Sequence, residues 1–167
     1  MERRPVYYID HGDLGGLMAA LRRRPETISF TDVGGQSLLH AAAGRKVPLD
    51  FAKELIRCGI DVDRQDQNGA TPLVYAASLG RTDVAKVIRG AGGRLDIADK
   101  HGNQPLWYAV GHPRSDTELI EFLIREGADP NYKNRYGKSP LSIARERKLE
   151  SLRSILEGGV PPKTTAG

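Results

Sequence analysis

The sequence predicts an all-α solenoid, because three features of the chain recur in step. A turn sequence with a glycine begins at Asp32, Asp66, Asp99 and Asn134, so the starts are 34, 33 and 35 residues apart. Each turn precedes a helix-start signal and a short run of apolar residues at helical spacing. A second amphipathic run then leads to the next turn. A helix pair this short cannot bury its apolar face alone, so the copies must stack on one another.

The unit from residue 66 to residue 98 shows the pattern in full. Gly69 closes the turn, and Thr71 then supplies an N-cap hydroxyl. Pro72 stands at the first helical position, where its missing N–H costs nothing. Gly80 ends the first helix of the pair. The sequence therefore predicts two short helices in every unit, with turn residues between the units.

The short motifs at the helix starts carry a family resemblance. Residues 70–77 read ATPLVYAA, and residues 36–42, 104–109 and 139–144 hold similar sequences at the same phase. With a period near 33, this T-P-L-H-x-A core resembles the ankyrin repeat over nearly the whole chain. The resemblance implies an ankyrin-repeat solenoid with four recognisable repeats and an N-terminal capping half-repeat. We expect one domain at 1–157, made of a cap (1–31) and repeats at 32–65, 66–98, 99–133 and 134–157, with a disordered tail at 158–167.

Two details refine this expectation. Leu14, Leu17, Met18 and Leu21 recur at helical spacing, and Gly12-Asp13 before them resembles the start of an ankyrin second helix, so residues 6–24 look like a degenerate first repeat that caps the stack. Arg89 stands where the ankyrin family has an apolar residue, so we expect the second helix of repeat 66–98 to be short or frayed.

Composition and targeting signals limit the class of protein. Hydrophobic residues make up 39% of the chain and charged residues 28%, as in an ordinary globular protein. The sequence has no apolar run of about 18 residues, which a membrane span would need. The N-terminus shows no secretory h-region, so we expect a cytoplasmic protein. The single cysteine, Cys58, excludes an internal disulfide and is expected to be a small buried or half-buried residue.

The net charge of +4 belongs to the last repeat and the tail. Residues 134–167 hold seven Lys or Arg and three Asp or Glu, whereas residues 1–133 hold eighteen of each. A basic end is one signature of nucleic-acid binding. However, both signs alternate between Arg145 and Arg153, which is typical of a solvated helix. Nucleic-acid binding therefore remains an alternative rather than the leading interpretation.

No motif in the sequence predicts a catalytic or metal-binding site. None of the four histidines pairs with another ligand at a metal-binding spacing, and His40 occupies the motif position at which the family uses it structurally. The sequence contains no phosphate-binding loop and no nucleophile elbow. We therefore expect no enzyme, no catalytic residue, no metal, no cofactor and no small-molecule substrate.

Protein binding is what the resemblance implies. In ankyrin stacks the turn tips and the exposed sides of the first helices form a concave strip, and Tyr and Arg are the residue types that anchor interfaces. The long loop at residues 111–116 is a second candidate surface. By motif phase, the candidate binding residues are Gln36, Arg45, Gln67, Asn68, Tyr75, Leu79, Lys100, His101, Tyr108, His112, Arg114, Arg135, Tyr136 and Lys138.

The resemblance also indicates a type of function. The chain resembles the small single-domain ankyrin proteins common in bacteria, some of which are immunity proteins that block a co-encoded toxin. We therefore expect a stand-alone inhibitor, monomeric when free, whose protein partner carries an acidic patch opposite the basic last repeat. The alternatives are a general regulatory scaffold or adaptor and a nucleic-acid binder, which a steep salt dependence of affinity would reveal.

Overall fold

A computed structural model describes residues 3–111 and 117–158 of the chain. Within these residues the structure is helical throughout, apart from turns and one isolated bridge between Thr31 and Ser37. The predicted all-α fold is therefore confirmed. The helices are α1 (Pro5–Asp10), α2 (Leu14–Arg23), the 3-10 helix η1 (Pro25–Ser29), α3 (Leu38–Gly44), α4 (Leu49–Arg57), α5 (Pro72–Ser78), α6 (Thr82–Gly90), α7 (Pro105–Gly111), α8 (Thr117–Arg125), α9 (Pro140–Glu146) and α10 (Glu150–Leu156).

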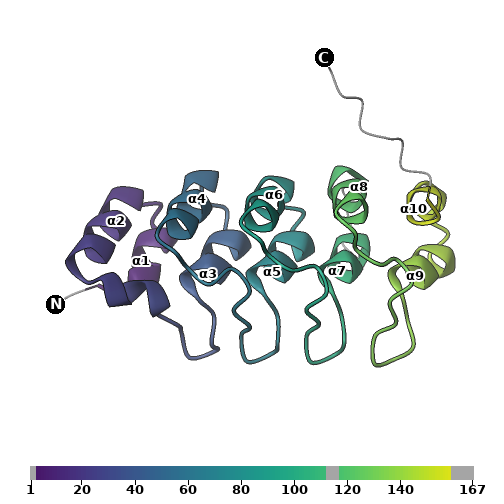
Figure 1. Cartoon of the computed structure of the whole chain (residues 1–167), viewed down its shortest axis with the longest axis horizontal. Coiled ribbons are helices and arrows are strands. Elements are labelled where there is room, and N and C mark those ends of the chain that lie inside the picture. Colours follow the sequence, from purple (N-terminus) through teal and green to yellow (C-terminus); the bar gives the residue numbers. More distant parts are fainter. Residues whose placement is uncertain (1–2, 112–116, 159–167) are drawn as a thin grey trace, which may run out of the picture.

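The helices stand in two rows, as a stack of helix pairs requires. Helices α3, α5, α7 and α9 form one row, and α4, α6, α8 and α10 form the other (Figure 1). The turns before the first helices project side by side beyond the first row (Figure 1). None of the helices in the described parts of the chain is long and apolar enough to span a bilayer.

Each turn is built by the side chain of the residue that begins it. The Asp66 Oδ1 atom accepts hydrogen bonds from the backbone amides of Asn68 at 2.8 Å and Ala70 at 2.9 Å. Asp32, Asp99 and Asn134 accept the equivalent pair of bonds in the other turns. A short polar side chain that bonds its own backbone two residues on is a strong turn former. The spacing of these residues therefore sets the phase of the whole stack.

Neighbouring turns are also bonded to each other through their backbones. The amide of Gln67 donates to the Gly34 carbonyl at 2.9 Å, and the amide of Lys100 donates to the Asn68 carbonyl at 2.8 Å. The amide of Arg135 donates to the His101 carbonyl at 3.0 Å. We call the four turns at residues 32–36, 66–70, 99–103 and 134–138, joined by these bonds, the tip row.

The core lies between the two rows of helices. Leu39, Leu73, Leu106 and Leu141 hold the same motif position in successive repeats, and all four are buried. Burying one such side chain stabilises the fold by about 1.5–3 kcal/mol. His40 is also fully buried, and its Nε2 atom lies 3.0 Å from the carbonyl oxygen of Ala70 in the next repeat.

The structure corrects three details of the sequence prediction. The cap holds a full helix pair, α1 and α2, rather than the expected half-repeat. Helix α6 has nine residues, as α4 and α8 do, so it is not short; Arg89 is accommodated by an ion pair with Glu126 at 3.4 Å. Cys58 is exposed, because it follows the last turn of α4 rather than lying within it. Of the predicted tail, residues 159–167 lie outside the described residues.

Candidate protein-binding face

The candidate side chains of the tip row contact one another from turn to turn. The Gln67 Nε2 atom donates to the Val33 carbonyl at 2.8 Å, and the Lys100 ammonium donates to Asn68 Oδ1 at 2.5 Å. His101 Nδ1 lies 3.1 Å from the Tyr136 hydroxyl. These polar side chains are therefore already placed by their neighbours, which lowers the entropy that a binding partner would have to remove.

The last two turns form an aromatic and cationic cluster, which we call the 101/136 patch: Lys100, His101, Arg135 and Tyr136. The rings of His101 and Tyr136 are stacked, with centroids 6.1 Å apart and planes at 27°. Tyr136 is 69% exposed although it is a large side chain. Arg135 is exposed beside it. An exposed tyrosine held by a stacked neighbour is the kind of residue that dominates protein interfaces.

The candidates Tyr75 and Tyr108 line an open groove between the second and third repeats, with a volume of about 380 Å³. The Tyr75 hydroxyl donates to Asp66 Oδ2 at 2.9 Å, and the Tyr108 hydroxyl donates to Asp99 Oδ2 in the same way. Burial and the neighbouring Asp99 raise the pKa of Tyr108 to about 12, and burial and Asp66 raise the pKa of Tyr75. Both hydroxyls therefore hold the turns in place, and the rings remain as the surface offered to a partner.

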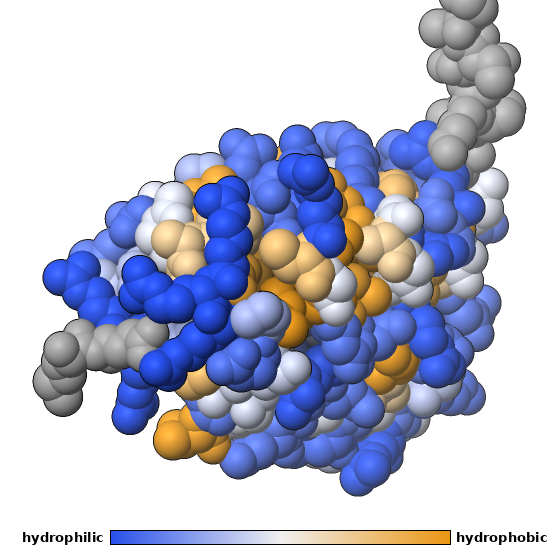
Figure 2. Space-filling model, turned by 60° about the vertical axis from the view of Figure 1, so that its left-hand side comes forward, coloured by the Kyte–Doolittle hydropathy of each residue, from blue (hydrophilic) through white to orange (hydrophobic). Residues whose placement is uncertain are grey.

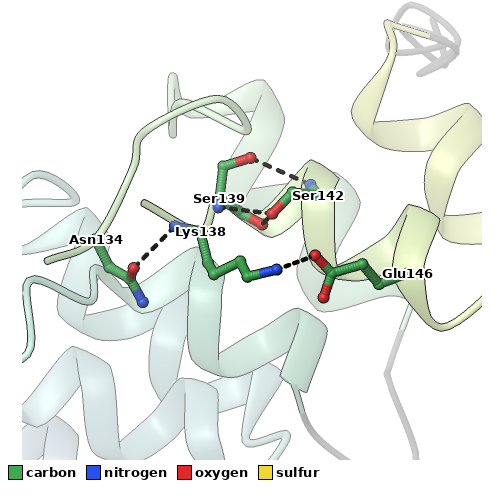
Figure 3. Close-up of polar contacts among 5 residues, drawn as sticks. All are labelled: Asn134, Lys138, Ser139, Ser142 and Glu146. Atoms are coloured by element: carbon green, nitrogen blue, oxygen red, sulfur yellow. Dashed lines mark hydrogen bonds and ion pairs between the residues drawn. The ribbon is translucent and has the colours of Figure 1, made fainter. Parts of the chain in front are cut away.

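Two candidates form ion pairs with neighbouring helices, and one of them, Lys138, lies in the last turn of the tip row. Arg45 lies between α3 and α4, and its Nε atom pairs with Asp10 of α1 at 2.5 Å. Lys138 forms an ion pair with Glu146 of α9 (Figure 3). In the same view, Asn134 accepts from the backbone amide of Lys138, which closes the last turn. Arg45 therefore ties the cap to the first repeat, and the charge of Lys138 is largely offset.

The remaining candidates are scattered. Leu79 is 49% exposed and directly follows α5. Gln36 lies in the first turn and is half-buried, and its backbone amide donates to Asp32 Oδ1 at 2.9 Å. His112, Arg114 and most of the long loop lie outside the described residues. The structure thus groups only the tip-row candidates and the two groove tyrosines into one continuous face.

One exposed tip residue was absent from the candidate set. Val33 is 91% exposed, although it is apolar. It directly follows the first residue of its turn, as Gln67, Lys100 and Arg135 follow theirs, so the repeat phase places it at a tip. Val33 gives the first turn an apolar contact point, where the last turns present aromatic and basic side chains.

The described residues contain no group of three His, Cys, Asp or Glu side chains placed to hold a metal ion. The four turn residues are engaged in the turns themselves, as their hydrogen bonds show. The exposed groups of the face are rings, amides and cations.

Comparison with known proteins agrees with this architecture. The family model "Ankyrin repeats (3 copies)" matches residues 11–99 and 38–134. The chain is 31% identical over 98 residues to human "Ankyrin repeat, SAM and basic leucine zipper domain-containing protein 1", covering 58% of this chain. It is 33% identical over 96 residues (56% of the chain) to the same protein of Rhinolophus ferrumequinum. The chain spans about one fifth of the length of these relatives, 21% and 20% respectively. With four phased turns, paired helices and these matches, the chain belongs to the ankyrin-repeat family, whose repeats form a protein–protein interaction module.

Proposed function

We propose that the chain binds one specific protein partner through its tip row and inhibits it. The observation that carries the proposal is the exposed Tyr136 ring, stacked on His101 in a turn that is bonded by its backbone to the turn before it. A surface already in its binding geometry loses little entropy on association. A tight blocking protein needs that property.

The anchors of the interface would be Tyr136 and Arg135, with the groove between Tyr75 and Tyr108 receiving a second contact. Truncating a true anchor costs about 2 kcal/mol or more in binding free energy. The rings of the groove tyrosines are half-buried, so they shape the face rather than project from it. Val33 would add an apolar contact at the first turn.

The partner would present an acidic patch to the 101/136 patch. Lys100 and Arg135 supply positive charge there, whereas Lys138 is paired with Glu146. Complementary charge speeds encounter and makes the association rate sensitive to salt. The last repeat supports nucleic-acid binding less well, because Arg145 pairs with Glu157 at 2.8 Å and Arg153 pairs with Glu150 at 3.0 Å.

In its sharpest form, the proposal is a cytoplasmic immunity protein, monomeric when free, that neutralises a toxin encoded beside it. What supports it is the rigid face together with the resemblance to small ankyrin proteins of that type. A regulatory scaffold or adaptor would use the same face without blocking its partner.

The test is co-expression with the products of neighbouring genes. The wild type should rescue growth from one of them and co-purify with it. The double variant Tyr136→Ala/Arg135→Glu should fold normally, as judged by circular dichroism, yet fail to rescue. A matched control, Tyr132→Ala/Arg64→Glu, changes an exposed tyrosine and an exposed arginine away from the tips, and should rescue fully.

The outcomes separate the levels of the proposal. If no neighbour is toxic or bound, the immunity role is lost. A partner that binds but stays active would make the chain a scaffold. Full rescue by the double variant would show that the tip row is the wrong surface.

A further inference from the structure

A second groove lies at the N-terminal end of the solenoid, away from the tip-row candidates. It lies between the start of α1 and the end of α2, with η1 beside it, and has a volume of about 390 Å³. Arg3, Arg4 and Arg24 line it together with the apolar side chains of Pro5 and Phe30. Residues far apart in the sequence thus meet in one hollow with apolar lining and arginines around it. We call it the arginine groove.

The side-chain charge at this end is slightly positive. Residues 1–31 contain five arginines and no lysine, against four acidic residues. Two of those acidic side chains are engaged in other contacts. Asp10 pairs with Arg45 at 2.5 Å, and Asp13 accepts a hydrogen bond from the Gly16 amide at 2.7 Å and caps α2. Glu26 remains beside the groove. Figure 2, which brings this end forward, shows long hydrophilic side chains projecting around small apolar areas.

Arg3 is held in place by a stack of rings along α1. Its guanidinium lies 4.3 Å from the centroid of the Tyr7 ring, and Tyr7 stacks on His11 with centroids 3.8 Å apart. Cation–π contact of this kind contributes about 0.5–1 kcal/mol at an exposed site. Arginine presents a rigid fork of N–H donors that matches a carboxylate at two points, which lysine cannot do. At Arg3 the groove therefore presents an oriented fork of donors.

We propose that the arginine groove binds an acidic segment of a protein, with one apolar side chain of that segment seated against Phe30 and Pro5. Carboxylates on either side of the apolar side chain would bond the arginines. The proposal does not depend on the tip row or on the inhibitor role, because it uses a different end of the molecule.

The groove fits a peptide better than a nucleic acid. Its arginines surround one apolar hollow, whereas a nucleic-acid strand requires cations spaced along a path of phosphates. The stacked faces of Tyr7 and His11 are already occupied by Arg3 and by each other. A base would have to displace those contacts in order to stack.

Fluorescence anisotropy with the full chain tests this. The probe is a labelled peptide with a central Leu–Phe pair between runs of glutamate. The comparison probes are the same peptide with serine in place of the apolar pair, and a single-stranded DNA of equal length. We expect the glutamate peptide to bind, and the serine peptide and the DNA to bind more weakly.

Variants locate the binding. Arg3→Gln/Arg4→Gln should raise the Kd for the glutamate peptide by about tenfold or more, since two charge-assisted contacts are lost. The control Arg57→Gln/Arg64→Gln removes the same charge elsewhere and should leave the Kd within about twofold. Tyr136→Ala should leave it unchanged, which separates this site from the tip row. Equal losses in both double variants, tighter binding of DNA, or no binding of the peptide would each overturn the proposal.

Discussion

His40 should make the stability of the fold depend on pH in a predictable direction. Its Nδ1 atom accepts from the Ser37 backbone amide at 3.0 Å, so the ring proton sits on Nε2 and is donated to the Ala70 carbonyl at 3.0 Å. The side chain is fully buried. Burial lowers the pKa of His40 below its ordinary value of 6.5, against the smaller opposing effect of the Ala70 hydrogen bond. A second proton would reside on Nδ1, where its N–H would face the backbone N–H of Ser37, which is also a donor.

The sign and size of the change in unfolding free energy follow from the difference between the folded and unfolded pKa of His40. Because the folded pKa lies below the unfolded one, the unfolded chain takes up the proton first as the pH falls. Stability contributed by neutral His40 is therefore complete above about pH 6.5 and is lost on acidification. One such group changes the free energy of unfolding by at most about 1.4 kcal/mol per pH unit. The loss grows as the pH falls below about 6.5, and by about pH 5.5 it can be no larger than about 1.4 kcal/mol.

Urea melts followed by circular dichroism between about pH 7.5 and pH 5.5 measure this loss. His40→Gln should be less stable at neutral pH by about 1–3 kcal/mol, because a buried bond between repeats is disturbed. Its stability should then change much less across the same pH range. His11→Gln is the matched control, since His11 is exposed, and it should keep the slope of the wild type. If His40→Gln shows the same slope as the wild type, other groups carry the pH dependence and the reasoning fails.

Further predictions concern packing and backbone conformation. Leu106 is 2% exposed, so Leu106→Ala should cost about 2–5 kcal/mol in denaturant melts, whereas Lys100→Ala should cost less than about 0.5 kcal/mol; equal costs would contradict the repeat phase. Gly102 has φ +79° and a Cβ there would lie 2.8 Å from the amide nitrogen of the next turn, while Gly59 has φ +81° and open space. Gly59→Ala should cost about 1–2 kcal/mol and Gly102→Ala clearly more, with a Tm difference as the readout. Lys148 has φ 56°, so Lys148→Gly should raise stability by about 1 kcal/mol, and a lower Tm would refute this.

Periodicity was enough to predict most of the fold. The turn and helix-start signals predicted two short helices in every unit, and the structure shows such a pair in each of the four repeats. The all-α solenoid and the family membership are confirmed, and the binding residues stay a prediction. Helix α1 was not placed from the sequence, because no turn sequence with a glycine precedes it as one precedes each later repeat. It is held instead by packing, with Ile9 fully buried.

The candidate site was less accessible to sequence reasoning, since it depends on contacts between distant residues. Motif phase located the tips, because each turn repeats the same geometry. Motif phase could not show that Arg45 is paired with Asp10, which lies a whole repeat earlier in the chain. Nor could it show that the hydroxyl of Tyr108 is engaged by the carboxylate of Asp99. Such pairings arise only when helices from different repeats are brought together.

The hydrogen bonds that hold the turns affect how this surface can change in evolution. Each turn is folded by its own first residue, and its backbone is bonded to the backbone of the turn beside it. The residue after that position, such as Gln67 or Arg135, can therefore be exchanged without disturbing a turn two repeats away. A lineage facing an altered target could adjust one repeat at a time, and each step would leave a folded protein. A recognition surface whose parts share a single core would require compensating changes at every step.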